Sequence, residues 1–118
     1  VIDIKEKYFD VVQYGMELAV KKGTARFGQI DSLVFCGKTG TAQNPHGEDH
    51  SIFMGFAPKD KPQIAIAVYV ENSGFGATWA VPIASLMIEK YLHREIATKR
   101  LHIEKRMMES VIEPKEKK

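Results

Sequence analysis

The sequence predicts an α+β fold, a fragment of an α/β sandwich in which a three-stranded antiparallel meander is flanked by an N-terminal and a C-terminal helix. Two observations carry this prediction. Apolar residues repeat with the period of a helix before and after the middle of the chain, and the middle holds apolar stretches that alternate as strands do. Because short polar loops join these stretches, neighbouring strands are expected to pair antiparallel, with the helices packed on the sheet.

The first helix is predicted to span residues 3–22. Its apolar stripe consists of Ile4, Tyr8, Val11, Val12, Gly15, Leu18 and Ala19. Asp3 is the expected N-cap because Glu6 follows three positions later, and Gly23 suits the position after the last turn. Residues 24–32 are mostly small or polar and are predicted to form a connection.

Three strands are expected after this connection. The apolar run 33–36 is predicted to be a buried strand that leads into Gly37, and the next two strands are residues 51–58 and 63–71. The pattern of 51–58 is typical of a strand covered on both faces. The strand at 63–71 has an alanine-rich face with room for a helix to approach closely.

The second helix is predicted to begin near Ala77 and to end at Tyr91 or His93. Pro82 is tolerated there because it falls in the first turns. The apolar stripe of this helix consists of Trp79, Ile83, Leu86, Met87 and Tyr91. Trp79 is expected to be a core anchor between the helix and the sheet.

The composition changes at Arg94, where dense charge with scattered apolar residues begins. Residues 1–93 are therefore predicted to be the folded segment, and residues 94–118 a charged C-terminal tail that is partly helical or disordered. A weak helical period would let part of the tail pack as an amphipathic helix, whereas Pro114 and the four residues after it indicate a frayed end.

Charge and composition exclude several classes of protein. The 17 basic and 15 acidic residues give a net charge of +2, which is too balanced to predict a nucleic-acid partner. No apolar run approaches the roughly 20 residues that span a bilayer. The chain begins at Val1 without a leader pattern, so we expect a piece of a longer polypeptide whose membrane anchor would lie upstream.

Residues 37–43, Gly-Lys-Thr-Gly-Thr-Ala-Gln, form the candidate binding site. Lys38 supplies a positive charge, Thr39 and Thr41 supply hydroxyls, and the two glycines leave room for the backbone of a ligand. Strand alternation puts Lys38 and Gly40 on one face and the two threonines on the other. Lys38 and Thr39 can therefore serve one anionic ligand only if the strand is twisted or lies at a sheet edge.

Three other kinds of site fit the sequence less well. A catalytic thiol at Cys36 would need a base beside it, and its apolar surroundings favour a packing role. His46 and His50, with two acids between them, could suggest a zinc site, but a Gly-Pro loop is poorly preorganised, and no metal or cofactor is predicted. A phosphate-binding Walker loop is disfavoured because Ser32 stands where its first glycine would be.

The extended motif resembles a known family. The motif 37–43, the run 52–58 (Ile-Phe-Met-Gly-Phe-Ala-Pro) and the apolar strand through Val70 are similar to the C-terminal part of the transpeptidase domain of class B penicillin-binding proteins, especially the elongation-type penicillin-binding protein 2. The resemblance covers residues 1–93 and is most specific over residues 37–71. It implies that 1–93 is the C-terminal segment of a serine β-lactamase/transpeptidase-like fold.

The resemblance implies a role for each residue of the motif. Lys38 would hold positive charge near the terminal carboxylate of the substrate and assist proton transfer around an active-site serine. Thr39 would donate a hydrogen bond to that carboxylate, and Gly40 would leave room for the peptide to pair beside the strand. The backbone N–H of Thr41 would contribute to the oxyanion hole. Gln43 would contact the substrate further along.

The same resemblance implies the activity of a peptidoglycan D,D-transpeptidase. In such enzymes a serine attacks a D-Ala-D-Ala bond, or the lactam of penicillin, and the acyl group then passes to an amine of a neighbouring stem peptide. The implied partners are peptidoglycan stem peptides, β-lactams and the upstream part of the same domain. The implied location is the periplasmic face of the bacterial inner membrane, with an anchor helix upstream.

The serine nucleophile of this family is missing from the chain. No serine has the Ser-x-x-Lys or Ser-x-Asn spacing among Ser32, Ser51, Ser73, Ser85 and Ser110. The chain alone is therefore predicted to be inactive, and exposed apolar surface is expected to cause self-association or binding of the missing part. A non-catalytic β-lactam-sensing module is the alternative, because sensors carry the same strand motif.

Overall fold

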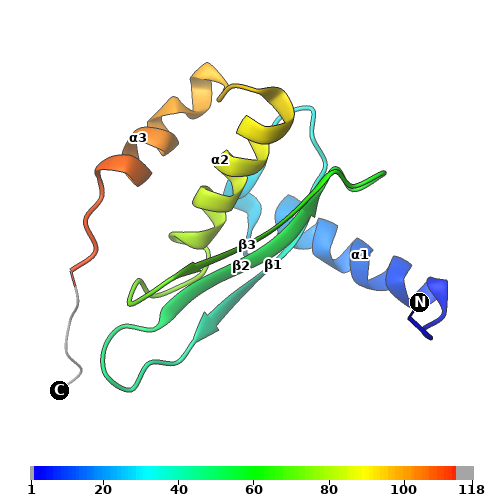
Figure 1. The fold of residues 1–118 in the computed structure, drawn as a ribbon, viewed down its shortest axis with the longest axis horizontal. Coiled ribbons are helices and arrows are strands. Elements are labelled where there is room, and N and C mark those ends of the chain that lie inside the picture. The colour runs from blue at the N-terminus through cyan, green and yellow to red at the C-terminus, as the bar shows by residue number, and fades with distance from the viewer. Residues whose placement is uncertain (1, 114–118) are drawn as a thin grey trace.

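The computed structural model describes residues 2–113, so the end predicted to be frayed, residues 114–118, lies outside the described residues. The elements are α1 (Glu6–Lys21), the short turn η1 (Arg26–Gly28), β1 (Cys36–Ala42), β2 (His50–Ala57), β3 (Ile64–Val70), α2 (Ala80–His93), the short turn η2 (Thr98–Arg100) and α3 (Leu101–Glu109). The strands form one antiparallel sheet in the order β1-β2-β3, which confirms the predicted meander between helices (Figure 1). None of the helices within residues 2–113 has the length and apolar character to cross a bilayer.

The core lies between α2 and one face of the sheet (Figure 1). Thr39 of β1 and Phe53 of β2 share that face, because residues directly opposite in antiparallel strands point the same way. The buried apolar cluster consists of Val20, Ala25, Ile30, Phe35, Phe53, Ala57, Ala80, Val81, Ala84 and Ile88. Small alanine side chains on α2 allow the helix to approach the sheet closely.

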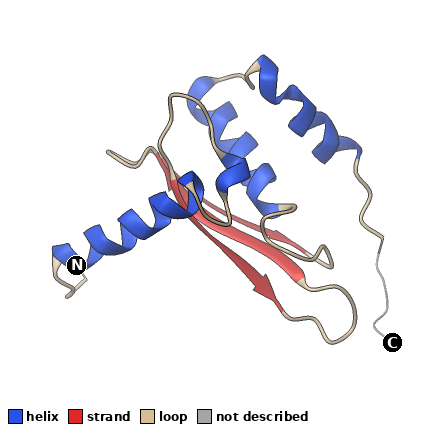
Figure 2. Cartoon of the chain, turned by 180° about the vertical axis from the view of Figure 1, so that it is seen from behind, coloured by secondary structure: helices blue, strands red, loops and turns tan. Residues whose placement is uncertain are grey.

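The other face of the sheet is open. Met54 in the middle of β2 is 55% exposed, and Ala65 and Ala67 of β3 are exposed as well. The prediction that β2 is covered on both faces is therefore wrong for the described residues. The reason is that α2 lies on the core face, while α1 crosses only one end of the sheet, near Cys36 (Figure 2). On the alanine-rich face of β3, Met16 of α1 lines a shallow hollow with Ala65 and Ala67.

Most of α1 extends away from the sheet (Figure 1). The helix begins at Glu6 without a side-chain cap, so the predicted Asp3 cap is wrong. Most of the predicted apolar stripe is exposed, Val11 by 70%. Only the last turns reach the core, where Glu17 and Val20 are buried, because the sheet ends before the rest of the helix.

An ion-pair cluster attaches the last turns of α1. The Glu17 carboxylate pairs with Lys21, at 2.5 Å, and with Lys59 after β2. The two lysines hold the pKa of Glu17 below its ordinary value of 4.5. A lowered carboxyl pKa stabilises the fold above the ordinary value, and this contribution is lost as the pH falls through the folded-state pKa.

We therefore expect acid to weaken the native chain more than a Glu17→Gln variant. Between about pH 5 and about pH 3, the free energy of unfolding in urea should fall more steeply for the native chain, because the variant has no carboxylate to protonate at this position. If the free energy of unfolding falls equally with pH in the two proteins, the ion pairs of Glu17 do not stabilise the attachment of α1.

The first strand begins later than predicted. β1 starts at Cys36 and contains nearly the whole candidate motif, because its pairing with β2 covers residues 36–42. Val34, inside the predicted strand 33–36, instead accepts the backbone N–H of Lys59 at 2.7 Å. Nearly all of the motif is therefore part of this strand, which agrees with the strand alternation expected for Lys38 and Thr39.

α2 begins three residues later than predicted, at Ala80. The buried Ser51 hydroxyl of β2 accepts the Ala80 N–H at 3.1 Å and donates to the Phe75 oxygen at 3.0 Å, which fixes the helix start. Of the predicted apolar stripe, only Leu86 is among the buried residues of the helix. The buried residues are Ala80, Val81, Pro82, Ala84, Ser85, Leu86, Ile88 and Glu89. Trp79 is half-buried at the helix start and is not part of the core cluster.

The tail contains α3, which lies beside α2 (Figure 1). Arg100, just before α3, donates to Glu89 Oε1 at 2.9 Å and to Ser85 Oγ at 2.6 Å. It also donates to the backbone oxygen of Gln29 at 2.8 Å. The Arg100 and Glu89 side chains are only 6% and 1% exposed, so the ion pair attaches the tail to the core.

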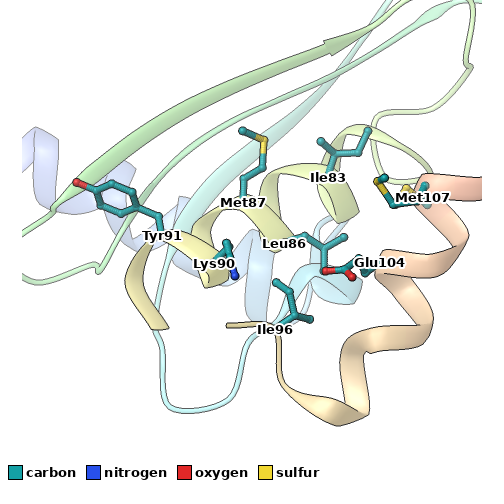
Figure 3. Close-up of a pocket in the computed structure, with 9 residues that line it drawn as sticks. Ile83, Leu86, Met87, Lys90, Tyr91, Ile96, Glu104 and Met107 are labelled. Atoms are coloured by element: carbon teal, nitrogen blue, oxygen red, sulfur yellow. The ribbon is translucent and has the colours of Figure 1, made fainter. Parts of the chain in front are cut away.

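An apolar groove of about 640 Å³ separates α2 from α3. Its walls are formed mainly by Ile83, Leu86 and Met87 of α2, Ile96 of the connecting segment and Met107 of α3 (Figure 3). Most of the apolar stripe predicted for α2 therefore lines this groove, because the sheet takes the alanine-rich side of the helix.

Candidate functional site

β1 is an edge strand of the described sheet. Within residues 2–113 its sheet neighbour is β2 alone, so the other side of β1 has no strand beside it. The register places Lys38 and Gly40 on the open face and Thr39 and Thr41 on the core face. The edge position satisfies the condition under which Lys38 and Thr39 can both serve one ligand.

The Lys38 side chain lies along this edge. It is exposed, and its Nζ donates to the backbone oxygen of Thr39 at 2.8 Å. The ammonium group is therefore held beside the backbone of the motif. An ammonium carries three donors, so one bond to the backbone leaves two for an anion.

The Thr39 hydroxyl meets a second threonine. Thr39 Oγ1 lies 2.8 Å from Oγ1 of Thr24, in the turn that follows α1. The sequence predicted only a connection at that turn. The contact was missed because 15 residues separate the two threonines and only the fold brings them together.

The two glycines of the motif, Gly37 and Gly40, lie in different surroundings. A Cβ on Gly37 would lie 2.1 Å from Cζ of Phe53, so this glycine makes room for a core ring, and its predicted role toward a ligand is wrong. A Cβ on Gly40 would meet only Ile52, at 3.5 Å, which is an ordinary contact. Packing within the described residues therefore does not require a glycine at position 40, which is consistent with room for an external backbone.

Thr41 and Gln43 are exposed at the far end of the motif. Thr41 pairs with Ser51, whose hydroxyl also binds the start of α2, so the backbone here is attached to the core. The loop before α2 packs at the same place, since a Cβ on Gly76 would lie 2.6 Å from the oxygen of Gly40. These contacts hold the motif in place from its core side.

Most of the serine hydroxyls in residues 2–113 are engaged in hydrogen bonds within the fold. Four of them donate to backbone oxygens: Ser51 to Phe75, Ser73 to Val70, Ser85 to Gly28 and Ser110 to Arg106. Ser32 is exposed in the turn before β1. Nothing in this arrangement brings a serine and a base together beside Lys38 within the described residues.

Asn44 organises the loop between β1 and β2. Its backbone N–H donates to Asp49 Oδ1 at 3.0 Å, its side-chain amide donates to the Glu48 oxygen at 3.0 Å, and its Oδ1 accepts the N–H of His46 at 3.0 Å. His50 Nδ1 likewise accepts a backbone N–H. Across residues 2–113, no three His, Cys, Asp or Glu side chains are grouped as metal ligands.

Cys36 packs at the start of β1. It is fully buried, and its Sγ lies 3.6 Å from the backbone oxygen of Gln13. Burial and, after it, the negative charge of Glu17 raise the pKa of the thiol. A raised pKa lowers the thiolate fraction at neutral pH, which is the opposite of what a catalytic thiol needs.

A sequence model of a known protein family matches most of this chain. The model described as the penicillin binding protein transpeptidase domain matches residues 1–89. Stage V sporulation protein D of Bacillus subtilis is 37% identical over 90 residues, which are 68% of this chain and 14% of the relative. Peptidoglycan D,D-transpeptidase MrdA of Acinetobacter baumannii is 35% identical over 94 residues, which are 67% of this chain and 13% of the relative. The chain thus spans about one seventh of the length of these relatives.

Solved structures give the same match. The Pseudomonas aeruginosa PBP2 structure, in complex with WCK 5153, superposes with a TM-score of 0.70 at 36% identity and covers 84% of this chain and 23% of that one. PBPA from Mycobacterium tuberculosis superposes with a TM-score of 0.62 at 30% identity, over 73% of this chain and 22% of that one. The range of the family model, residues 1–89, includes the sheet that carries the candidate motif.

Proposed function

This chain belongs to the penicillin-binding protein transpeptidase domain family, and we propose that it is the substrate-binding segment of a peptidoglycan D,D-transpeptidase. The observation that carries the proposal is the Lys38-Thr39-Gly40 triplet on an edge strand, with Lys38 exposed and its ammonium beside the strand backbone. A charged edge of this kind suits an extended peptide that ends in a carboxylate.

Each residue of the edge has a role in this proposal. The Lys38 ammonium and the Thr39 hydroxyl bind the terminal carboxylate of a stem peptide or a β-lactam. Gly40 lets the ligand backbone lie beside β1. When a serine oxygen attacks the carbonyl carbon, the Thr41 N–H stabilises the oxyanion, and the terminal D-alanine leaves with a proton. Gln43 contacts the ligand beyond the reacting bond.

The rest of a transpeptidase domain supplies what this chain lacks. The serine nucleophile and its base come from that part, which covers the open face of the sheet around Met54 and the exposed stripe of α1 around Val11. We call the assembly of this chain with that part the complete domain. Without it, the same apolar surface leads to self-association. The complete domain works at the periplasmic face of the inner membrane, where peptidoglycan is assembled, and its anchor lies outside residues 2–113.

Covalent labelling with a fluorescent penicillin tests this function. The chain alone should take no label, because it lacks the serine. A complete domain, made by replacing the matching segment of Pseudomonas aeruginosa PBP2 with this chain, should be labelled. Circular dichroism and thermal unfolding establish that the chimera is folded. Label on the isolated chain, or a folded chimera that takes none, would contradict the proposal.

A further inference from the structure

Thr24 contacts the candidate site from outside the motif. Its Oγ1 lies 2.8 Å from Oγ1 of Thr39. Thr24 is exposed and Thr39 is half-buried, so the pair lies where the β1 edge meets solvent. The Thr39 hydroxyl therefore has Thr24 as a neighbour at the edge where a ligand would bind.

The turn that carries Thr24 has a fixed position. The Gly23 N–H donates to the Leu18 oxygen at 3.1 Å, and the Ala25 N–H donates to the Ala19 oxygen at 3.0 Å. Ala25 is fully buried, and a Cβ on Gly23 would lie 2.9 Å from Cα of Ala19. These contacts fix the backbone on both sides of Thr24. The end of α1 and the core therefore determine where the Thr24 hydroxyl lies relative to β1.

The directions of the two hydroxyl protons decide what this contact does. A carboxylate has only acceptor atoms, so the Thr39 hydroxyl must donate a hydrogen bond to bind one. Thr39 Oγ1 is then free to accept a hydrogen bond, and the Thr24 hydroxyl lies within hydrogen-bond distance to donate it. Two hydrogen bonds then run in series, from the Thr24 hydroxyl to Thr39 Oγ1 and from the Thr39 hydroxyl to the carboxylate. Each of these hydrogen bonds polarises the other and strengthens it.

We propose that Thr24 is a positioning residue of the β1 site. Its hydroxyl holds Thr39 in the rotamer and the hydrogen-bond direction that serve the terminal carboxylate of a D,D-peptide or a β-lactam. This inference rests on the proposed function and adds to it a residue 14 positions before the motif lysine, from Thr24 to Lys38. Thr24 does not touch the ligand and acts only through Thr39.

Two substitutions of Thr24 test the hydroxyl itself. Thr24→Val removes it and keeps the branched shape, whereas Thr24→Ser keeps it. In the complete domain we expect Thr24→Val to lower the second-order rate constant of acylation by a fluorescent penicillin about three- to tenfold, the effect of one net hydrogen bond. Thr24→Ser should stay within about twofold of the wild type. Thr98→Val, at an exposed threonine of η2, is the matched control and should leave the rate unchanged.

A double-mutant cycle separates positioning from support of the fold. If Thr24 acts through Thr39, Thr24→Val has no further effect on the acylation rate in a Thr39→Val background. A purely structural role would give the same factor in both backgrounds. Equal rates for the wild type and Thr24→Val, or independent effects of the two substitutions, would overturn the inference. A folded wild-type complete domain that takes no label would instead refute the proposed function.

Discussion

Lys38→Met will lower the second-order rate constant for acylation of the complete domain by a fluorescent penicillin about 100- to 1,000-fold, the size of effect known for one charge-stabilising donor in an acyl-transfer site. The substitution keeps the length of the side chain and removes its charge from the β1 edge, where Nζ now lies 2.8 Å from the Thr39 oxygen. A bound carboxylate then loses its charge-assisted hydrogen bond. Time courses of labelling measure the change.

Two variants control for the loss of a lysine as such. Lys38→Arg keeps the charge but changes its geometry, so it should retain part of the rate. Lys105→Met removes an exposed lysine of α3, far along the chain from β1, and should acylate like the wild type. A Lys38→Met domain that acylates within about threefold of the wild type would show that this cation has no part in the reaction.

Arg100→Met will lower the free energy of unfolding of the chain by about 3–5 kcal/mol, the cost of breaking a buried ion pair by removing one partner. The substitution leaves Glu89, whose side chain is 1% exposed, as an uncompensated charge in the core. It also removes the donors to Ser85 Oγ and to the Gln29 oxygen. Urea unfolding measures the difference.

The neighbouring residue, Lys99, forms an exposed ion pair that provides the control. Lys99 pairs with Asp31, but their side chains are 60% and 77% exposed, so Lys99→Met should cost at most about 1 kcal/mol. If Arg100→Met does not fold, the double variant Glu89→Leu with Arg100→Met should recover most of the stability, because both charges are then absent. An Arg100→Met chain as stable as Lys99→Met would refute the account of the tail.

The helices α1 and α2 and the strands β2 and β3 could be predicted from sequence because each has a local period or a turn signal. Their partners could not. The stripe of α1 that contains Val11 was assigned to a core, but the surface that would cover it is not among the described residues. The stripe predicted for α2 contains Trp79, which was expected to anchor the helix to the sheet, whereas the sheet instead packs on the alanine-rich side around Ala84. Periodicity shows that a helix has an apolar side, and it does not show which side a neighbour takes.

In the candidate site, too, the local geometry could be predicted from sequence and the contacts with distant segments could not. Strand alternation correctly assigned Lys38 and Thr39 to opposite faces, because that follows from backbone geometry alone. The contact of Thr24 with Thr39 and the support of the helix start by Ser51 depend on segments far apart in the chain. A Thr or Ser in a connection has no pattern that marks such a contact, so only the fold reveals it.

The most direct measurement is a crystal structure of the complete domain acylated by a penicillin. The account predicts that the carboxylate of the bound penicillin lies within about 3.2 Å of Thr39 Oγ1, with the Lys38 ammonium turned toward the ligand. Thr24 Oγ1 should remain in contact with Thr39. A carboxylate bound away from β1, with Lys38 still on the Thr39 oxygen, would contradict the account.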